Sequence, residues 1–295
     1  MSVLLNEKTG KGIPLLMKKA GIILFAAVSV LSCSVFSGCQ KKQAETFEMP
    51  QEYKLSFSEE FENGYDEKIW AVSKDTPRKG GYWSDEQVFT ENGNLIIRTE
   101  YKENGNASGY YTGELSWPNM RSTYGYYEIR CKVDNVRGAW SAFWLMPDNI
   151  SNMEQKAQDG CEIDIFESAL PYKVQNTLHY DGYKRSNKKI TKLDDMYDGF
   201  HTYALDWKKD SMKFYYDNKL LWEITDPDLI SAYPVYMDIS TEINGDMKNG
   251  KPEFNRWFWL GCGKIDNKNN NLPSDFVVDY VKVYDNGDLV WSEKE

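Results

Sequence analysis

Three carboxylates, Glu162, Asp164 and Glu167, fall within the run Gly-Cys-Glu-Ile-Asp-Ile-Phe-Glu-Ser at positions 160–168. Acidic side chains held close together repel one another and lose hydration, so folds seldom gather them for stability alone. Two carboxyl groups about 5–5.5 Å apart can cleave a glycosidic bond with retention, one as the nucleophile and the other as the acid that protonates the leaving oxygen. A solvated acidic face on an edge strand, or a calcium site, would use the same residues.

The element that must position these acids is a short strand, predicted by the β-branched and aromatic residues between them. Period-two alternation points Glu162 and Asp164 to one face of that strand and Glu167 to the other. A single extra residue, a β-bulge within positions 165–166, would return Glu167 to the side of its partners. Such a strand would carry the nucleophile and the acid on one face, with Asp164 between them.

The first part of the 295-residue chain has the features of a targeting segment. Lys18 and Lys19 precede an apolar run at 21–36, which matches the charged and apolar regions of a secretory signal and is short for a membrane span. The run ends at Ser-Gly-Cys, with the cysteine at position 39, and this resembles the cleavage box of a bacterial lipoprotein.

We therefore expect Cys39 to become the acylated N-terminus of an exported protein anchored to a bacterial membrane and exposed at the surface. Cys33, which follows Val-Leu-Ser, is a competing acylation site, and an ordinary cleaved signal is the alternative. The expected organisation is a signal peptide over 1–39, a polar tether over 40–52 and one catalytic domain over 53–290.

The composition of the remaining chain limits which disulfides, metal sites and partners it can have. Cys131, Cys161 and Cys262 are odd in number and lack metal-binding spacing, so they imply no disulfide framework, and at most one pair could bridge. The formal charge of −10 argues against nucleic acid and other polyanionic partners. A neutral substrate and a monomeric protein are the expectation.

Short alternating segments separated by Asn, Gly, Asp and Pro recur along the mature chain, and helix-period stretches of useful length do not. This spacing is typical of a large antiparallel sandwich. The expected strands include 94–99, 124–133, 139–146, 177–180, 201–207, 211–216, 233–240 and 276–284.

The acidic run and its surroundings together resemble glycoside hydrolase family 16, whose bulged signature is E-x-D-x-x-E. Four further parts of the chain are similar to segments of that family, in the same order. They are the opening strand at 57–61, the strand pair before the acidic run at 124–130 and 138–147, a later hairpin at 200–207 and 213–220, and the closing strand at 279–284. The resemblance covers roughly residues 55–285.

The resemblance implies an all-β fold, an antiparallel β-jelly-roll sandwich of the concanavalin A-like kind, with a substrate cleft on its concave sheet. It also implies endo-acting, retaining hydrolysis of a polysaccharide without a required cofactor. Matched by position, Glu162 would be the nucleophile, Glu167 the general acid/base and Asp164 the assisting carboxylate.

Aromatic side chains are the expected lining of the cleft, because sugar rings present apolar CH faces. Alternation places Trp140 and Trp144 on one face of the strand at 139–146, where either residue could instead be core. His179 occupies a position that faces the cleft in relatives. Trp83 and Trp117 lie on segments that the resemblance places nearby.

Some members of the family hold a structural calcium ion on the convex side, between the opening and closing strands. Glu60 and Asp279 occupy comparable places, so the resemblance allows calcium there, and surface acids are the alternative.

The predicted function is a retaining endo-β-glucanase that cleaves β-1,3-glucan (laminarin), mixed-linkage β-1,3-1,4-glucan, or both. The bulged signature resembles the laminarinase branch of the family, and agarases and carrageenases share it, so a galactanase is one alternative. The other is a non-catalytic surface lipoprotein that binds glycans.

Overall fold

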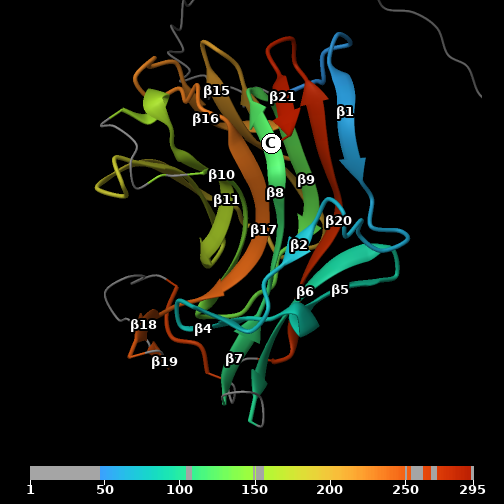
Figure 1. Cartoon of the computed structure of the whole chain (residues 1–295), viewed down its shortest axis with the longest axis vertical. Helices are drawn as coiled ribbons and strands as arrows, with labels where there is room; N and C mark the ends of the chain where they lie inside the picture. Colours follow the sequence, from blue (N-terminus) through green and yellow to red (C-terminus); the bar gives the residue numbers. More distant parts are fainter. Residues whose placement is uncertain are drawn as a thin grey trace, which may run out of the picture. The chain divides into compact units, whose positions relative to one another are not determined.

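The computed structural model describes residues 47–103, 108–148, 150, 156–249, 251–253, 262–266 and 271–293. Backbone contacts divide the chain into two units, Met1–Lys42 and Gln43–Glu295, and all described residues belong to the second. They form two large β-sheets packed face to face (Figure 1). Pairing is antiparallel with the exception of β4 and β7. The predicted antiparallel sandwich is therefore confirmed.

The larger sheet has eleven strands. Its spatial order is β16 (Lys219–Ile224), β15 (Met212–Tyr216), β14 (His201–Trp207), β9 (Gly125–Lys132), β20 (Ser274–Asp285), β6 (Asn94–Lys102), β7 (Gly109–Thr112), β4 (Gly81–Trp83) and β3 (Thr76–Arg78). Two further strands pair with members of this order, β1 (Lys54–Glu59) with β20 and β5 (Val88–Glu91) with β6.

The second sheet has eight strands and carries the acidic run. Its order is β13 (Arg185–Lys192), β12 (Lys173–Tyr180), β11 (Glu162–Leu170), β10 (Ala139–Pro147), β17 (Val235–Ile243), β8 (Glu114–Thr123) and β2 (Ala71–Val72), with β21 (Val290–Glu293) paired to β8. The remaining elements are the hairpin of β18 (Asp246–Lys248) with β19 (Lys251–Glu253) and the 3-10 turns η1 (Asp85–Gln87) and η3 (Ala157–Asp159).

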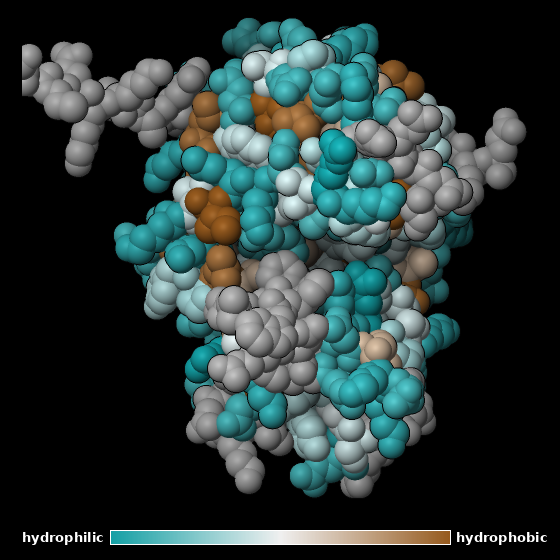
Figure 2. Space-filling view, turned by 90° about the vertical axis from the view of Figure 1, so that its left-hand side faces the viewer, coloured by the Kyte–Doolittle hydropathy of each residue, from teal (hydrophilic) through white to brown (hydrophobic). Residues whose placement is uncertain are grey.

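The core lies between the two sheets and is built from the apolar positions of alternating strands. In β17, Val235, Met237 and Ile239 point into this core, and the polar residues between them point outward. Fully burying one such side chain contributes about 1.5–3 kcal/mol. The eight-stranded sheet curves so that its outer face is concave (Figure 1). Viewed from that side, the molecule is mostly hydrophilic with small hydrophobic patches (Figure 2).

The predicted tether over 40–52 includes residues that pack on the domain. The Phe47 ring stacks on Tyr126 with a centroid distance of 5.2 Å and an interplanar angle of 11°, and it also contacts Tyr215. Residues 1–46, including Cys33 and the predicted acylation site Cys39, lie outside the described residues. Among the described residues, no helix is long and apolar enough to cross a membrane.

The three cysteines predicted to lack a disulfide framework, Cys131, Cys161 and Cys262, are all free and buried. Burial raises the pKa of the Cys161 thiol above its usual range. They behave as small apolar core residues.

Candidate active site

The three acids of the acidic run share one face of β11 because the strand contains a β-bulge. Against β10, Asp164 pairs with Trp144 and Phe166 pairs with Phe143, so Ile165 is the extra residue. Against β12 the register shifts at the same place. The apolar residues of the strand, Ile163, Ile165 and Phe166, all lie in the core. The predicted bulge is confirmed, and it turns Glu167 outward beside Glu162 and Asp164.

A side chain of β12 donates a hydrogen bond to the backbone carbonyl of the bulge residue. Asn176 Nδ2 donates to the Ile165 carbonyl oxygen at 2.6 Å, and Asn176 is almost fully buried. A buried carbonyl without a partner would cost roughly 1–3 kcal/mol. Asn176 therefore stabilises the local geometry that points Glu167 outward.

The acids lie in an open cleft on the concave sheet, whose space amounts to about 560 Å³ with the adjoining solvent included. Side chains of adjacent strands lie level with one another in the cleft, because Trp144 of β10 pairs with Asp164 of β11 on one side and with Asp238 of β17 on the other. The cleft is lined by Arg78, Lys79, Trp140, Ala142, Trp144, Glu162, Asp164, Glu167, His179, Tyr183, Ser240 and Glu242.

Glu167 is nearly buried and receives two hydrogen bonds from β12. Gln175 Nε2 donates to Glu167 Oε2 at 3.0 Å, and Thr177 Oγ1 donates to the same oxygen at 3.4 Å. Burial, with a further contribution from the negative charge of Asp164, raises the pKa of Glu167 to about 8. Glu167 therefore carries a proton at neutral pH. Since both donors bond Oε2, Oε1 is the oxygen available to hold it.

Glu162 has partners that favour its ionised form. Burial raises the pKa of Glu162, and His179, a hydrogen bond from Tyr183 and the cation of Arg78 oppose this effect. The Tyr183 hydroxyl donates to Glu162 Oε2 at 2.5 Å. Of the two glutamates, Glu162 is the one better provided with groups that stabilise negative charge.

Asp164 lies between the two glutamates and is buried. Its Oδ2 atom is 3.4 Å from His179 Nε2. Burial, followed by the charge of Glu162, raises the pKa of Asp164 well above its ordinary value. Three carboxyl groups this close cannot all be ionised, so the cluster combines an acid with a carboxylate, as a pair of catalytic carboxyls requires.

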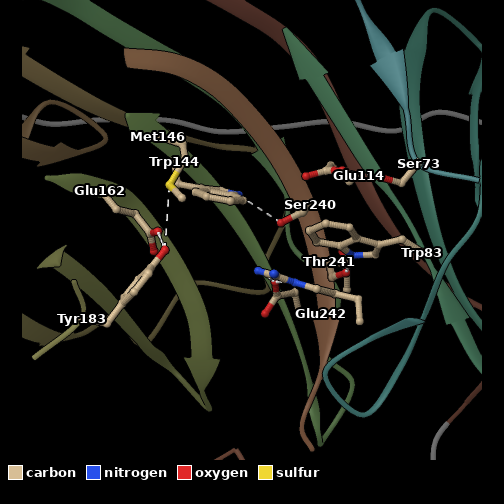
Figure 3. Close-up of polar contacts among 11 residues, drawn as sticks. Ser73, Trp83, Glu114, Trp144, Met146, Glu162, Tyr183, Ser240, Thr241 and Glu242 are labelled. Atoms are coloured by element: carbon tan, nitrogen blue, oxygen red, sulfur yellow. Dashed lines mark hydrogen bonds and ion pairs between the residues drawn. The ribbon is translucent and has the colours of Figure 1, made fainter. Parts of the chain in front are cut away.

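Two of the predicted tryptophans line the cleft. Trp140 and Trp144 project from the outer face of β10, and Phe143 and Leu145 point into the core, as alternation predicted. Trp144 Nε1 donates to Ser240 Oγ at 3.1 Å, which fixes the orientation of its ring (Figure 3). The predicted His179 also lines the cleft.

Trp83 packs with Trp140, Ala142 and Trp144 and is not itself among the residues that line the cleft. Its Nε1 donates to the Thr241 carbonyl oxygen at 2.9 Å, and the Arg78 guanidinium lies over its ring, 4.5 Å from the centroid. Trp83 thus supports Arg78, which faces the cleft.

The prediction that Trp117 contacts substrate is wrong. Trp117 is buried in the core between the sheets, where its ring packs against Phe57, Trp70 and Trp291. On β8 it follows Leu115 by two residues, so both side chains point inward. The outward position between them is Ser116.

The calcium site suggested at Glu60 and Asp279 does not fit the structure. Glu60 lies 2.9 Å from Lys282 Nζ and accepts a hydrogen bond from Ser58. Asp279 forms an ion pair with Arg130. Because each carboxylate is already neutralised by a cation, neither offers the uncompensated charge that a Ca²⁺ ligand supplies.

Five cleft residues were not anticipated from the sequence: Arg78, Lys79, Tyr183, Ser240 and Glu242. Ser240 and Glu242 alternate with the apolar residues of β17, and this pattern could have indicated an outward face. Arg78 ion-pairs with Glu242, and Figure 3 shows Glu242 on the side of the cleft opposite Glu162. Arg78 ends the three-residue strand β3 and Tyr183 lies in a turn, and neither segment is long enough for periodicity to predict the direction of its side chain.

Close backbone packing holds the turn that presents Arg78 and Lys79. Gly80 follows them, and a Cβ atom added to Gly80 would lie 2.4 Å from the Asn244 carbonyl oxygen at the end of β17. Only glycine permits this approach of the two segments.

Comparison with known proteins gives consistent matches. The family model described as Glycosyl hydrolases family 16 matches residues 77–257. A β-glucanase of Rhodothermus marinus is 26% identical over 285 residues, covering 85% of this chain and 92% of that protein. A glucan endo-1,3-β-glucosidase A1 of Niallia circulans is 23% identical over 227 residues, covering 68% of this chain but 31% of its own greater length.

The solved structure of SCLam, described as a non-specific endo-β-1,3(4)-glucanase, superimposes with a TM-score of 0.66 at 27% identity. The match covers 82% of this chain and 94% of that one. The extent and consistency of these matches agree with the fold and with the acid-lined cleft.

Proposed function

The chain belongs to glycosyl hydrolase family 16, since the model of that family matches residues 77–257 of its 295 residues, and from this premise we propose that it is a retaining endo-β-glucanase. Its proposed substrates are β-1,3-glucan, mixed-linkage β-1,3-1,4-glucan, or both. The observation that carries the proposal is the bulged strand, which presents Glu162, Asp164 and Glu167 on one face of an aromatic-lined cleft, with the pKa of Glu167 raised to about 8.

The reaction takes place in two displacements. Glu162 attacks the anomeric carbon, the bond to the leaving oxygen breaks, and Glu167 transfers its proton to that oxygen. Glu167, now ionised, takes a proton from a water molecule, which attacks the same carbon and releases Glu162. Asp164 keeps the pKa of Glu167 raised before the first step.

The choice of a neutral glucan rests on two observations. Trp140 and Trp144 offer flat apolar faces to sugar rings. The β-glucanase of Rhodothermus marinus and SCLam, which match 85% and 82% of this chain, are named as glucanases. A keratan-sulfate endo-1,4-β-galactosidase of Sphingobacterium multivorum matches 79% of it, which keeps a galactanase as the alternative. The cations in the cleft lining are Arg78, which Glu242 neutralises, and Lys79.

The test is to incubate the protein with laminarin, mixed-linkage glucan and agarose and to size the products. We expect oligosaccharides from at least one glucan, and release from neither would contradict the proposal. Release from agarose alone would support the galactanase alternative. Binding to a glucan without new reducing ends would support a non-catalytic glycan-binding protein.

Glu162→Gln is the matched control for this assay, because it keeps the size of the side chain and removes the nucleophile. We expect it to lower hydrolysis by about a thousandfold or more while the protein remains folded. Near wild-type hydrolysis by this variant would contradict the assignment of Glu162.

We also propose that the protein is exported and anchored to a bacterial membrane by lipid at Cys39, as a surface-exposed enzyme. The support is the N-terminal sequence alone. Cys39→Ser should move the protein from the membrane fraction to the soluble fraction, and Cys33→Ser should not. Retention of the Cys39→Ser variant would contradict acylation at that position.

A further inference from the structure

Tyr183 reaches the catalytic strand from an unusual turn. It belongs to the connection between β12 and β13, where Asp181, Gly182 and Tyr183 have φ angles of 52°, 59° and 66°. Residues other than glycine pay roughly 1–2 kcal/mol for this left-handed conformation. The Asp181 carboxylate, 3.6 Å from Lys184 Nζ and 3.4 Å from Arg185 Nε, ties the turn together.

Core packing does not explain why Tyr183 is held in this conformation. Its exposed fraction is 51%, among the highest for the large hydrophobic side chains of the described residues. Its hydroxyl, by contrast, points into the cleft (Figure 3), where it donates to Glu162 Oε2 at 2.5 Å and lies 3.9 Å from Met146 Sδ. The ring lies beside His179, at a centroid distance of 5.7 Å. The geometry of the turn therefore serves the contact with Glu162.

Glu162 is surrounded by charges of both signs from several strands. The titratable groups around it are Asp164 and Glu167 on β11, His179 on β12, Arg78 on β3 with Lys79 after it, Asp238 and Glu242 on β17, and Tyr183 on the β12–β13 turn. Arg78 is neutralised in part by Glu242, and His179 is shared with Asp164. Tyr183 is the group with a direct hydrogen bond to the Glu162 carboxylate.

We propose that Tyr183 is a positioning residue for the nucleophile: its hydroxyl holds Glu162 ionised and occupies Oε2, so that Oε1 is the oxygen that attacks. This inference rests on the proposed function of Glu162. It extends that function to a turn outside the signature strand, whose direction no sequence pattern predicts.

The role has a consequence for the second displacement. When water releases the sugar, the bond to Glu162 breaks and negative charge returns to its carboxylate. A donor already placed at Oε2 stabilises that charge as it develops. Loss of the donor should therefore slow the release of Glu162 and lower kcat without raising KM.

The test is Tyr183→Phe, which removes the hydroxyl and keeps the ring beside His179. Hydrogen bonds to ionised groups shift a pKa by about one unit, so the acidic limb of the kcat/KM profile should move up by about one pH unit. We expect kcat to fall about tenfold and the basic limb, set by Glu167, to stay in place.

Tyr172→Phe is the matched control. Tyr172 is also an exposed tyrosine with a left-handed φ of 54°, and it lies in the turn between β11 and β12 with its ring against Tyr197. It does not line the cleft. Its variant should keep the wild-type pH profile, and equal melting temperatures of the two variants would show that both are folded.

An unmoved acidic limb in Tyr183→Phe would overturn the inference, as would a rise in kcat/KM, which would indicate that the tyrosine obstructs the nucleophile. If the wild-type protein released nothing from either glucan, the proposed function would fail separately. The titration of Glu162, followed by carbon-13 NMR of carboxyl-labelled glutamate, would then test the inference directly. An unchanged Glu162 midpoint between wild type and Tyr183→Phe would refute it.

Discussion

At the scale of single residues, Glu162 and Glu167 share one face of one strand yet meet different partners. Glu162 receives a hydroxyl donor and lies near cations, and Glu167 receives neutral donors in a nearly buried place beside Asp164. These different surroundings are the basis for the proposed roles of Glu162 as nucleophile and Glu167 as acid, although the residue type is the same.

This difference predicts the upper limit of the pH range for activity. The raised pKa of Glu167, about 8, means that the required proton is present below that pH and lost above it. We expect kcat/KM on a soluble glucan to fall as pH rises through about 8. A basic limb that remains in Glu167→Ala, measured on a substrate with a good leaving group, would show that another residue sets it.

A second prediction separates the cleft tryptophan from the core tryptophan. Trp140→Ala removes a ring from the cleft and should raise KM about tenfold, since ring contacts contribute roughly 0.5–1.5 kcal/mol beyond the area that they bury. Trp117→Ala leaves a cavity in the core and should lower the free energy of unfolding by about 3–5 kcal/mol. Steady-state kinetics and urea denaturation distinguish them, and the reverse pattern would contradict the assignment of both residues.

At the scale of elements, the alternation of β10 could be predicted from the period of a strand. The bulge in β11 could be predicted because that period alone would separate Glu167 from the other two acids. The family resemblance misplaced Trp117, since it located the segment near the cleft but did not say which face of the strand carries the tryptophan. Counting from Leu115, an evident core residue, would have placed Trp117 inward. Arg78, at the end of the three-residue strand β3, and Tyr183, in a turn, could not be predicted, because tertiary contacts set the direction of such short segments.

Strand β12 stabilises the bulge of β11 through Asn176, and this contribution to stability can be tested. Asn176→Ala removes the donor to the Ile165 carbonyl and should cost about 1–3 kcal/mol of unfolding free energy, together with a loss of kcat as Glu167 loses its position. Asn94→Ala is the control, since Asn94 donates to the Asn92 carbonyl on the exposed surface. Equal effects of the two substitutions on stability and kcat would contradict this role.

At the scale of the whole molecule, the fold keeps several acids in conditions that favour their neutral form. Glu167 is one, and Asp134, buried near Ser141, is another, with its pKa raised by burial to about 6. The folded protein therefore binds more protons than the unfolded chain above pH ~4, where an unfolded carboxyl group ionises. The stabilisation that these bound protons provide is complete below that pH. It is lost as pH rises through about 6, the pKa of Asp134, and about 8, the pKa of Glu167.

We accordingly expect the melting temperature to decrease from about pH 4.5 to about pH 8. Asp134 alone would account for roughly 2–3 kcal/mol of this change. Asp134→Asn should flatten the dependence between pH 4 and 6, and Glu91→Gln, at an exposed position on β5, should not. A melting temperature that rises steadily over this range would contradict the description of the buried acids.

The central claim is that Glu162 and Glu167 act together as a nucleophile and an acid on one bulged strand, and the configuration of the first product tests it most directly. Proton NMR of a glucan digest, recorded before mutarotation, should show the new reducing end first as the β-anomer, because two displacements at the anomeric carbon retain its configuration. An α-anomer as the first product would mean a single displacement by water and would contradict the assignment of Glu162 as the nucleophile.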